Sequence, residues 1–176
     1  DPSLDSDALV DEFCRLHYRE AAPVILEYIG YIRDNADRLG CHPNCGAMPN
    51  ELGLTPEVAV KAMDYFKTAL AAAQSDEVRS RVEKASIPAY RALILVNGCP
   101  WKVENDVVKR DLAPEYAGLV PQYIALCKKY NMSRVSEGLA SEDYFDRLQK
   151  MDAMPALQLD NATLRLTVLP EENGKL

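Results

Sequence analysis

Helix-start signals recur along this chain, and each one introduces a run of apolar residues at helical spacing. Ser6, Thr55, Ser75 and Ser141 are each followed by acidic residues or by a proline and an acid. This composition suits a helix N-terminus, because a hydroxyl caps a free backbone N–H and acidic charge favours the positive end of the helix dipole. Short connections between successive helices favour antiparallel neighbours. The sequence therefore predicts an up-and-down helical bundle.

Five to seven helices are predicted. The first begins at Ser6 and carries Leu9, Phe13 and Leu16 at helical spacing, and the others lie over residues 21–39, 56–73, 76–97, 103–110, 114–130 and 141–151. Gly40 and Asn131 are expected to end two of them, since both residues tolerate the left-handed conformation. Pro88 falls inside the fourth helix and is expected to kink or break it around Ser86.

The spacing of apolar residues changes near the C-terminus. From Thr163 to Leu169 apolar and polar residues alternate, which is typical of a half-buried β-strand. The Asn173-Gly174 pair that follows is a strong signal for a tight hairpin turn. We therefore expect a mainly α fold with a helical bundle over 1–154, and a linker plus a short C-terminal β-hairpin from a truncated β-domain over 155–176.

Bulk composition restricts the partners. The 176 residues are 48% hydrophobic, with a net charge of −7 and a pI near 4.9. An acidic surface repels phosphate backbones, so no nucleic-acid partner is expected. No apolar run approaches the roughly 20 residues that cross a bilayer, so no membrane partner is expected either.

The five cysteines are too few and too scattered for a disulfide framework. Cys14 and Cys127 lie on apolar helix faces and are predicted core residues. Cys41, His42 and Cys45 form a compact cluster that is a weak candidate for zinc, because no second ligand pair follows. A disulfide between the two thiols, or two free thiols, are the alternatives. No cofactor is expected.

Two stretches carry a family resemblance. Residues 7–29 include DALVDEF, then HYREAAP and YI, and residues 54–90 include LTPE, RVEKA and PAY. They resemble a family of uncharacterised domains in carbohydrate-degrading proteins that have an α-glucuronidase-like N-terminal region. The resemblance covers roughly residues 1–95. His17 stands where that family usually has tyrosine, and Arg19 where it usually has glycine.

The resemblance implies a non-catalytic helical accessory domain of a glycoside-hydrolase-like protein. Its partners would be an upstream (β/α)-barrel and a downstream β-domain of the same chain, together with carbohydrate, and the parent would be exported. The segment itself is predicted to be inactive, even if the parent is a glycoside hydrolase. The alternative is a stand-alone helical module that binds another protein, and a third, weaker reading is a metal- or redox-active protein built on Cys41 and Cys45.

Two aromatic residues are the candidate substrate-binding residues. Trp101, the only tryptophan, and Tyr18 can stack an aromatic ring on the apolar face of a sugar, although both types more often fill gaps between helices. Carboxylates gather near the first helix junction, namely Asp11, Glu12, Glu20 and Glu27. Nearness in sequence does not make the paired carboxyl groups of a glycosidase, so no catalytic residue is predicted.

Overall fold

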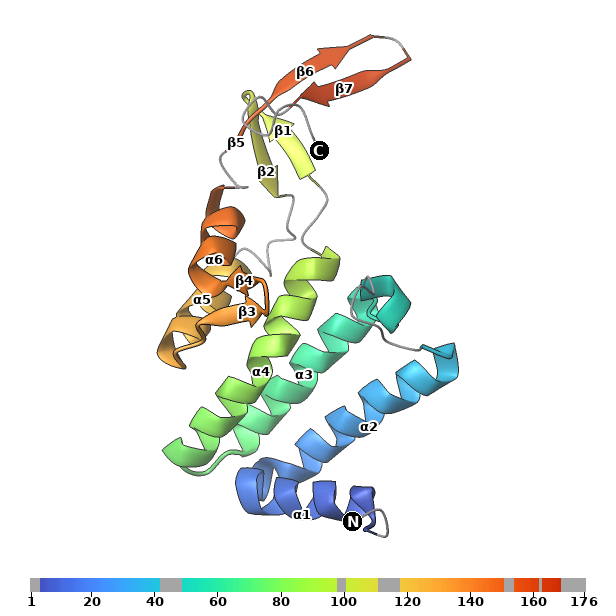
Figure 1. The fold of residues 1–176 in the computed structure, drawn as a ribbon, viewed down its shortest axis with the longest axis vertical. Helices are drawn as coiled ribbons and strands as arrows, with labels where there is room; N and C mark the ends of the chain where they lie inside the picture. Colours follow the sequence, from blue (N-terminus) through green and yellow to red (C-terminus); the bar gives the residue numbers. More distant parts are fainter. Residues whose placement is uncertain are drawn as a thin grey trace. The chain divides into compact units, whose positions relative to one another are not determined.

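The computed structural model of the chain describes residues 4–41, 49–97, 101–110, 118–150, 154–161 and 163–168. Most of these residues are α-helical, and short antiparallel strands occur towards the C-terminus, as predicted (Figure 1). Contacts between Cα atoms divide the chain into an N-terminal unit, residues 1–96, and a C-terminal unit, residues 97–176. The predicted boundary at residue 154 falls inside the second unit, close to its last strand pair.

The N-terminal unit is entirely helical over its described residues. Its elements, in chain order, are α1 (Ser6–Tyr18), the 3₁₀ turn η1 (Arg19–Ala21), α2 (Ala22–Leu39), the 3₁₀ turn η2 (Pro49–Leu52), α3 (Pro56–Ala72) and α4 (Asp76–Asn97).

Side chains at the predicted positions cap two of these helices. The hydroxyls of Thr55 and Ser75 accept the backbone N–H of Val58 and Val78 at 3.3 and 3.2 Å. The prediction was wrong by one residue at the first helix, where the carboxylate of Asp5 accepts the N–H groups of residues 7 and 8. An ionised oxygen makes the stronger cap, since it also meets the positive end of the helix dipole.

The core of the N-terminal unit lies along α3 and α4, and α2 packs against both α1 and α3. Small residues on α3 allow close helix approach, and Phe66 contacts the ring of Tyr28 with their centroids 4.8 Å apart. The large buried side chains of this unit are Ile25, Val58, Met63, Phe66, Val78, Val82, Ile87, Leu93 and Ile94. The stripes predicted on α3 and α4 are thus largely the buried ones.

A kink or a break was predicted around Ser86, and helix α4 continues through Pro88 without a break. Ile87 and Ala89, on either side of the proline, are both buried. Their packing offsets the roughly 3 kcal/mol that an interior proline costs a helix. The Ser86 hydroxyl also donates to the Glu83 carbonyl oxygen at 2.7 Å.

The C-terminal unit mixes strands with two helices. Its elements are β1 (Trp101–Glu104), β2 (Val107–Arg110), α5 (Leu119–Lys129), β3 (Arg134–Ser136), β4 (Leu139–Ala140), α6 (Ser141–Lys150), β5 (Met154–Pro155), β6 (Leu157–Asp160) and β7 (Arg165–Val168). They form a three-stranded sheet in the order β1-β2-β5 and two separate hairpins, β3-β4 and β6-β7.

The short helix predicted over residues 103–110 is instead a β-hairpin. Strands β1 and β2 pair antiparallel with Glu104 opposite Val107, which leaves Asn105 and Asp106 as a two-residue loop. Both loop residues have positive φ, 53° and 61°. This is the turn that matches the twist of paired strands, and asparagine and aspartate tolerate it.

Helices α5 and α6 pack through Tyr123 and Phe145, whose rings meet edge to face at 6.1 Å. Asn131 has a φ of 52° just beyond α5, as predicted. The predicted start of that helix at Pro114 lies outside the described residues. Ser141 begins α6, but its buried hydroxyl has no hydrogen-bond partner among the described residues, so it is not the predicted cap.

The predicted C-terminal strand is present as β7, but its partner precedes it in the chain. Strands β6 and β7 pair Leu157 with Val168 and Leu159 with Leu166. These apolar pairs share one face, because directly opposite residues in a ladder point the same way. The Asn173-Gly174 turn lies outside the described residues.

Candidate functional site

Helix α1 presents a row of large apolar side chains to solvent. Leu9, Phe13 and Leu16 are spaced by four and three residues, so they share one helix face. They are 48%, 56% and 70% exposed. We call these three residues the α1 surface. The opposite face of the helix buries Cys14, as predicted, where α1 packs against α2.

Aromatic contacts hold the centre of the α1 surface in place. The Phe13 ring stacks on His17 with centroids 5.0 Å apart and planes at 15°. Tyr18 meets both rings edge-on, at 6.3 Å from Phe13 and 4.8 Å from His17. The half-buried Tyr18, predicted as a substrate-binding residue, therefore contacts the ring of the exposed phenylalanine.

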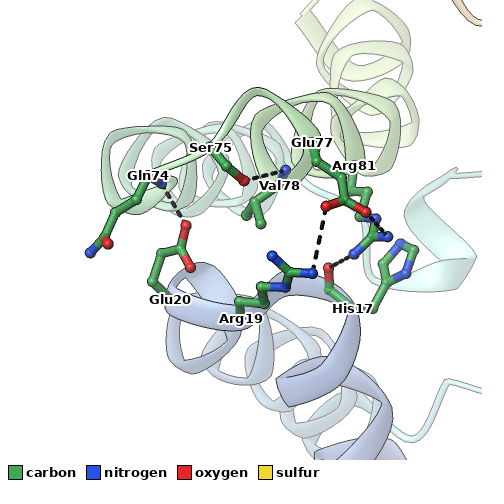
Figure 2. A network of polar contacts seen from close by, with 8 residues as sticks. All are labelled: His17, Arg19, Glu20, Gln74, Ser75, Glu77, Val78 and Arg81. Carbon is green, nitrogen blue, oxygen red and sulfur yellow. Dashed lines mark hydrogen bonds and ion pairs between the residues drawn. The ribbon is translucent and has the colours of Figure 1, made fainter.

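A sharp corner follows α1, and Arg19 forms it with φ 47° and ψ −116°. A side chain is strained in this region, which glycine occupies freely. Figure 2 shows Arg19 and Glu20 extending from the corner towards the residues that begin α4. The corner is thus where α1, α2 and the α3–α4 connection meet.

Polar contacts tie this corner to α4 (Figure 2). The Arg81 guanidinium donates to the His17 carbonyl oxygen at 2.9 Å, and Arg19 pairs with Glu77 at 3.5 Å. The Glu20 carboxylate accepts the Gln74 backbone N–H at 2.6 Å. Glu77 also pairs with Arg81. Exposed ion pairs contribute only about 0–1 kcal/mol each, so the network fixes geometry more than stability.

Two ionisable groups at the corner, His17 and Glu20, have a shifted pKa. Burial, and then the positive charge of Arg81, lower the pKa of His17, so the imidazole stays neutral. The backbone hydrogen bond from Gln74 lowers the pKa of Glu20. A glycosidase general acid needs a raised pKa, and Glu20 has the opposite shift.

A hollow of about 480 Å³ lies where α1 meets α2. Ala22, Pro23 and Leu26 supply its apolar wall, and its charged lining residues are Arg15, Arg19, Glu20 and Glu27. Two of the four carboxylates noted in the sequence therefore line one hollow. Asp11 pairs with Arg15 at 2.5 Å on α1, and Glu12 does not line the hollow.

The other predicted site residues are elsewhere. Trp101 opens strand β1 in the C-terminal unit, where its Cα pairs with Arg110, whereas Tyr18 belongs to the N-terminal unit. Cys41 has a free, half-buried thiol, and His42 and Cys45 lie outside the described residues. Over the described ranges, no three His, Cys, Asp or Glu residues are grouped to hold a metal.

Comparison with protein-family models, with curated proteins and with solved structures found no match for this chain. In the described part of the chain, every helix is too short or too polar to span a bilayer. Assignment of a function therefore rests on the site itself.

Sequence reasoning found the residues of the α1 surface but not their exposure. The spacing of Leu9, Phe13 and Leu16 shows only that they share a face. Whether that face is covered depends on how the neighbouring helices pack around α1, and α2 packs against the face that carries Cys14.

Proposed function

We propose that this chain is a non-catalytic helical accessory domain of a glycoside-hydrolase-like, carbohydrate-processing protein, and that it packs through the α1 surface against the barrel domain of that protein. The observation that carries the proposal is the exposure of Leu9, Phe13 and Leu16 on one helix face. Contiguous large apolar side chains in solvent mark surfaces that another protein covers.

The backbone at Arg19 supports the family part of the proposal. Its φ of 47° is one that glycine adopts without strain, and the resembling family usually has glycine at this position. A corner of this shape thus agrees with the residue that the family uses there.

The strand pair β6–β7 supports a following β-domain. Leu157, Leu159 and Leu166 on its apolar face are 57%, 64% and 48% exposed. A lone hairpin is at best marginally stable in water, and further strands or a packed layer are needed to stabilise one.

The second candidate function is a stand-alone helical module that binds a separate protein, which the same α1 surface favours. The two functions differ in where the partner is encoded. An open reading frame with a barrel-sized region before Asp1 agrees with the accessory domain, and a start codon near Asp1 overturns it in favour of the module.

A binding experiment completes the test. The region encoded upstream is expressed separately and its affinity for this chain is measured by calorimetry. We expect the double substitution Phe13→Ser and Leu16→Ser to weaken binding at least tenfold, because hot-spot residues at the centre of an interface dominate its affinity. Equal affinity of the wild type and the double variant would show that the α1 surface is not the contact.

A further inference from the structure

The α1 surface is ordered before any partner arrives. His17 and Tyr18 hold the Phe13 ring on two sides, and Arg81 fixes the backbone at His17. A side chain that is already held loses little conformational entropy on binding. The surface therefore has the pre-organisation of a contact site rather than the freedom of an isolated exposed residue.

Most charged side chains of α1 and its N-cap are acidic, and two of them, Asp5 and Glu12, lie four and three residues from Leu9 and so flank the α1 surface. Together with its N-cap, α1 carries the carboxylates of Asp5, Asp7, Asp11 and Glu12 and a single guanidinium, that of Arg15. The net charge of this segment is −3 with His17 neutral, within a chain whose net charge is −7.

Some of this charge is balanced inside the N-terminal unit. Asp11 pairs with Arg15 on the same helix, and Asp7 pairs with Arg33 of α2 at 3.0 Å. Glu12, in contrast, is exposed on α1 and takes part in no ion pair among those found over the described residues. Its charge is available to a partner.

The net negative charge of α1 argues against two kinds of partner for the α1 surface. A second copy would bring its own acidic α1 against this one, and like charges across an interface disfavour association. An anionic bilayer surface would be repelled for the same reason. A cationic helix with an apolar stripe avoids both conflicts, because its stripe covers the leucines and its cations face Asp5 and Glu12.

We propose that the α1 surface binds a basic amphipathic helix, whose apolar stripe packs on Leu9, Phe13 and Leu16 and whose lysine or arginine residues face Asp5 and Glu12. This inference rests on the proposed function, because it names the chemistry of the surface that the accessory domain covers.

The experiment uses the full chain and two synthetic four-turn amphipathic helices with the same leucine stripe. One carries lysines on its polar face and the other carries glutamates. We expect saturable binding of the lysine peptide by methyl NMR, with shifts confined to Leu9, Leu16 and their neighbours. Higher ionic strength should weaken it, since salt screens exposed charges.

Substitutions locate the contact. Phe13→Ser should weaken binding of the lysine peptide by about tenfold, and Glu12→Gln by a smaller, salt-dependent factor. The matched control is Leu95→Ser, which removes another exposed leucine, on α4, and should leave affinity unchanged.

The outcomes separate this inference from the proposed function. Equal binding of the glutamate peptide at the α1 surface would overturn the basic partner and leave a docking surface in place. Binding that Phe13→Ser does not change would overturn both. Phe13-dependent self-association, or Phe13-dependent binding to phosphatidylglycerol vesicles, would assign the surface to a second copy or to a membrane and would also overturn the basic helix.

Discussion

Helices α1 and α3 have apolar stripes of similar make-up, yet one is exposed and the other is buried. On α3 the stripe includes Met63 and Phe66, which are 7% and 2% exposed. On α1 the stripe of Leu9, Phe13 and Leu16 lies in solvent. The stripe of α3 faces the bundle, where Phe66 contacts Tyr28 of α2, whereas α1 packs against α2 through its opposite face, which carries Cys14. An amphipathic sequence thus predicts a helix, but a bundle must supply neighbours before its stripe becomes core.

The largest expected difference is between two phenylalanines. Replacing Phe66 with alanine should lower the free energy of unfolding by about 3–5 kcal/mol, because it leaves a cavity in the core. Replacing Phe13 with alanine should change it by about 0.5 kcal/mol or less, as for exposed positions. Urea denaturation of the two variants measures both values. A loss of several kcal/mol for Phe13→Ala would mean that the α1 stripe is core after all.

Arg19→Gly should stabilise the protein by removing the backbone strain at the corner that follows α1. Glycine removes backbone strain of about 1–3 kcal/mol, while losing the ion pair with Glu77 costs about 0–1 kcal/mol and the added freedom of the unfolded chain costs about 0.5–1 kcal/mol. We expect a net gain of about 1 kcal/mol in thermal denaturation. Arg19→Ala is the control, since it removes the ion pair but keeps the strain, and a gain of the same size for alanine would contradict the strain account.

Lowering the pH should loosen the same corner in two steps. His17 has a folded pKa below its usual 6.5, so its contribution to stability is complete above that value and is lost as pH falls through the folded pKa. The folded pKa of Glu20 is also lowered, from its usual 4.5, so its contribution to stability is likewise lost as the pH falls below that value. The free energy of unfolding, measured between pH 7 and 3, should lose the His17 step in the His17→Asn variant and keep the Glu20 step. An unchanged profile would show that His17 is not responsible.

The smallest expected effect concerns the other exposed apolar face, on β6 and β7. Every residue of β6 is exposed, and none of the described residues from 161 to 168 is buried, so removing residues 157–176 takes away no buried side chain that the structure describes. The melting temperature of the remaining chain should stay nearly unchanged, as measured by circular dichroism at 222 nm. A loss of several degrees in a monomeric protein would show that the hairpin is integral to the fold, and would count against a β-domain that continues beyond it.

Local signals recovered the helices better than the strands. Thr55, Ser75 and Gly40 were identified because caps depend on a few neighbouring atoms, and all three act as predicted. The hairpin at Asn105-Asp106 was read as helix, since its two strands are only four residues long and their pairing is a contact that no periodicity reveals. A kink or a break was predicted at Pro88 because the cost of proline is local, whereas the packing of Ile87 and Ala89 that keeps the helix unbroken is not.

The candidate site was predictable only in part. Tyr18 was identified from the sequence, and its ring contacts Phe13 of the α1 surface. The proposed contacts of Tyr18 and Trp101 with a sugar stay predictions. The exposure of Phe13 and the strained φ of Arg19 emerge only from the three-dimensional packing of α1 against α2. Sequence shows which residues share a helix face, and tertiary structure decides whether that face is core or surface.

The most direct test of the α1 surface is the solvent accessibility of its methyl groups, with and without the lysine peptide. A soluble gadolinium chelate broadens methyl signals that solvent reaches. In the free chain we expect strong broadening for Leu9 and Leu16 and little for Val78 and Val82, which are fully buried. The peptide should protect Leu9 and Leu16 while Leu157 and Leu159 stay broadened. Leu9 and Leu16 signals that are already protected in the free chain, or that the peptide leaves broadened, would contradict the account.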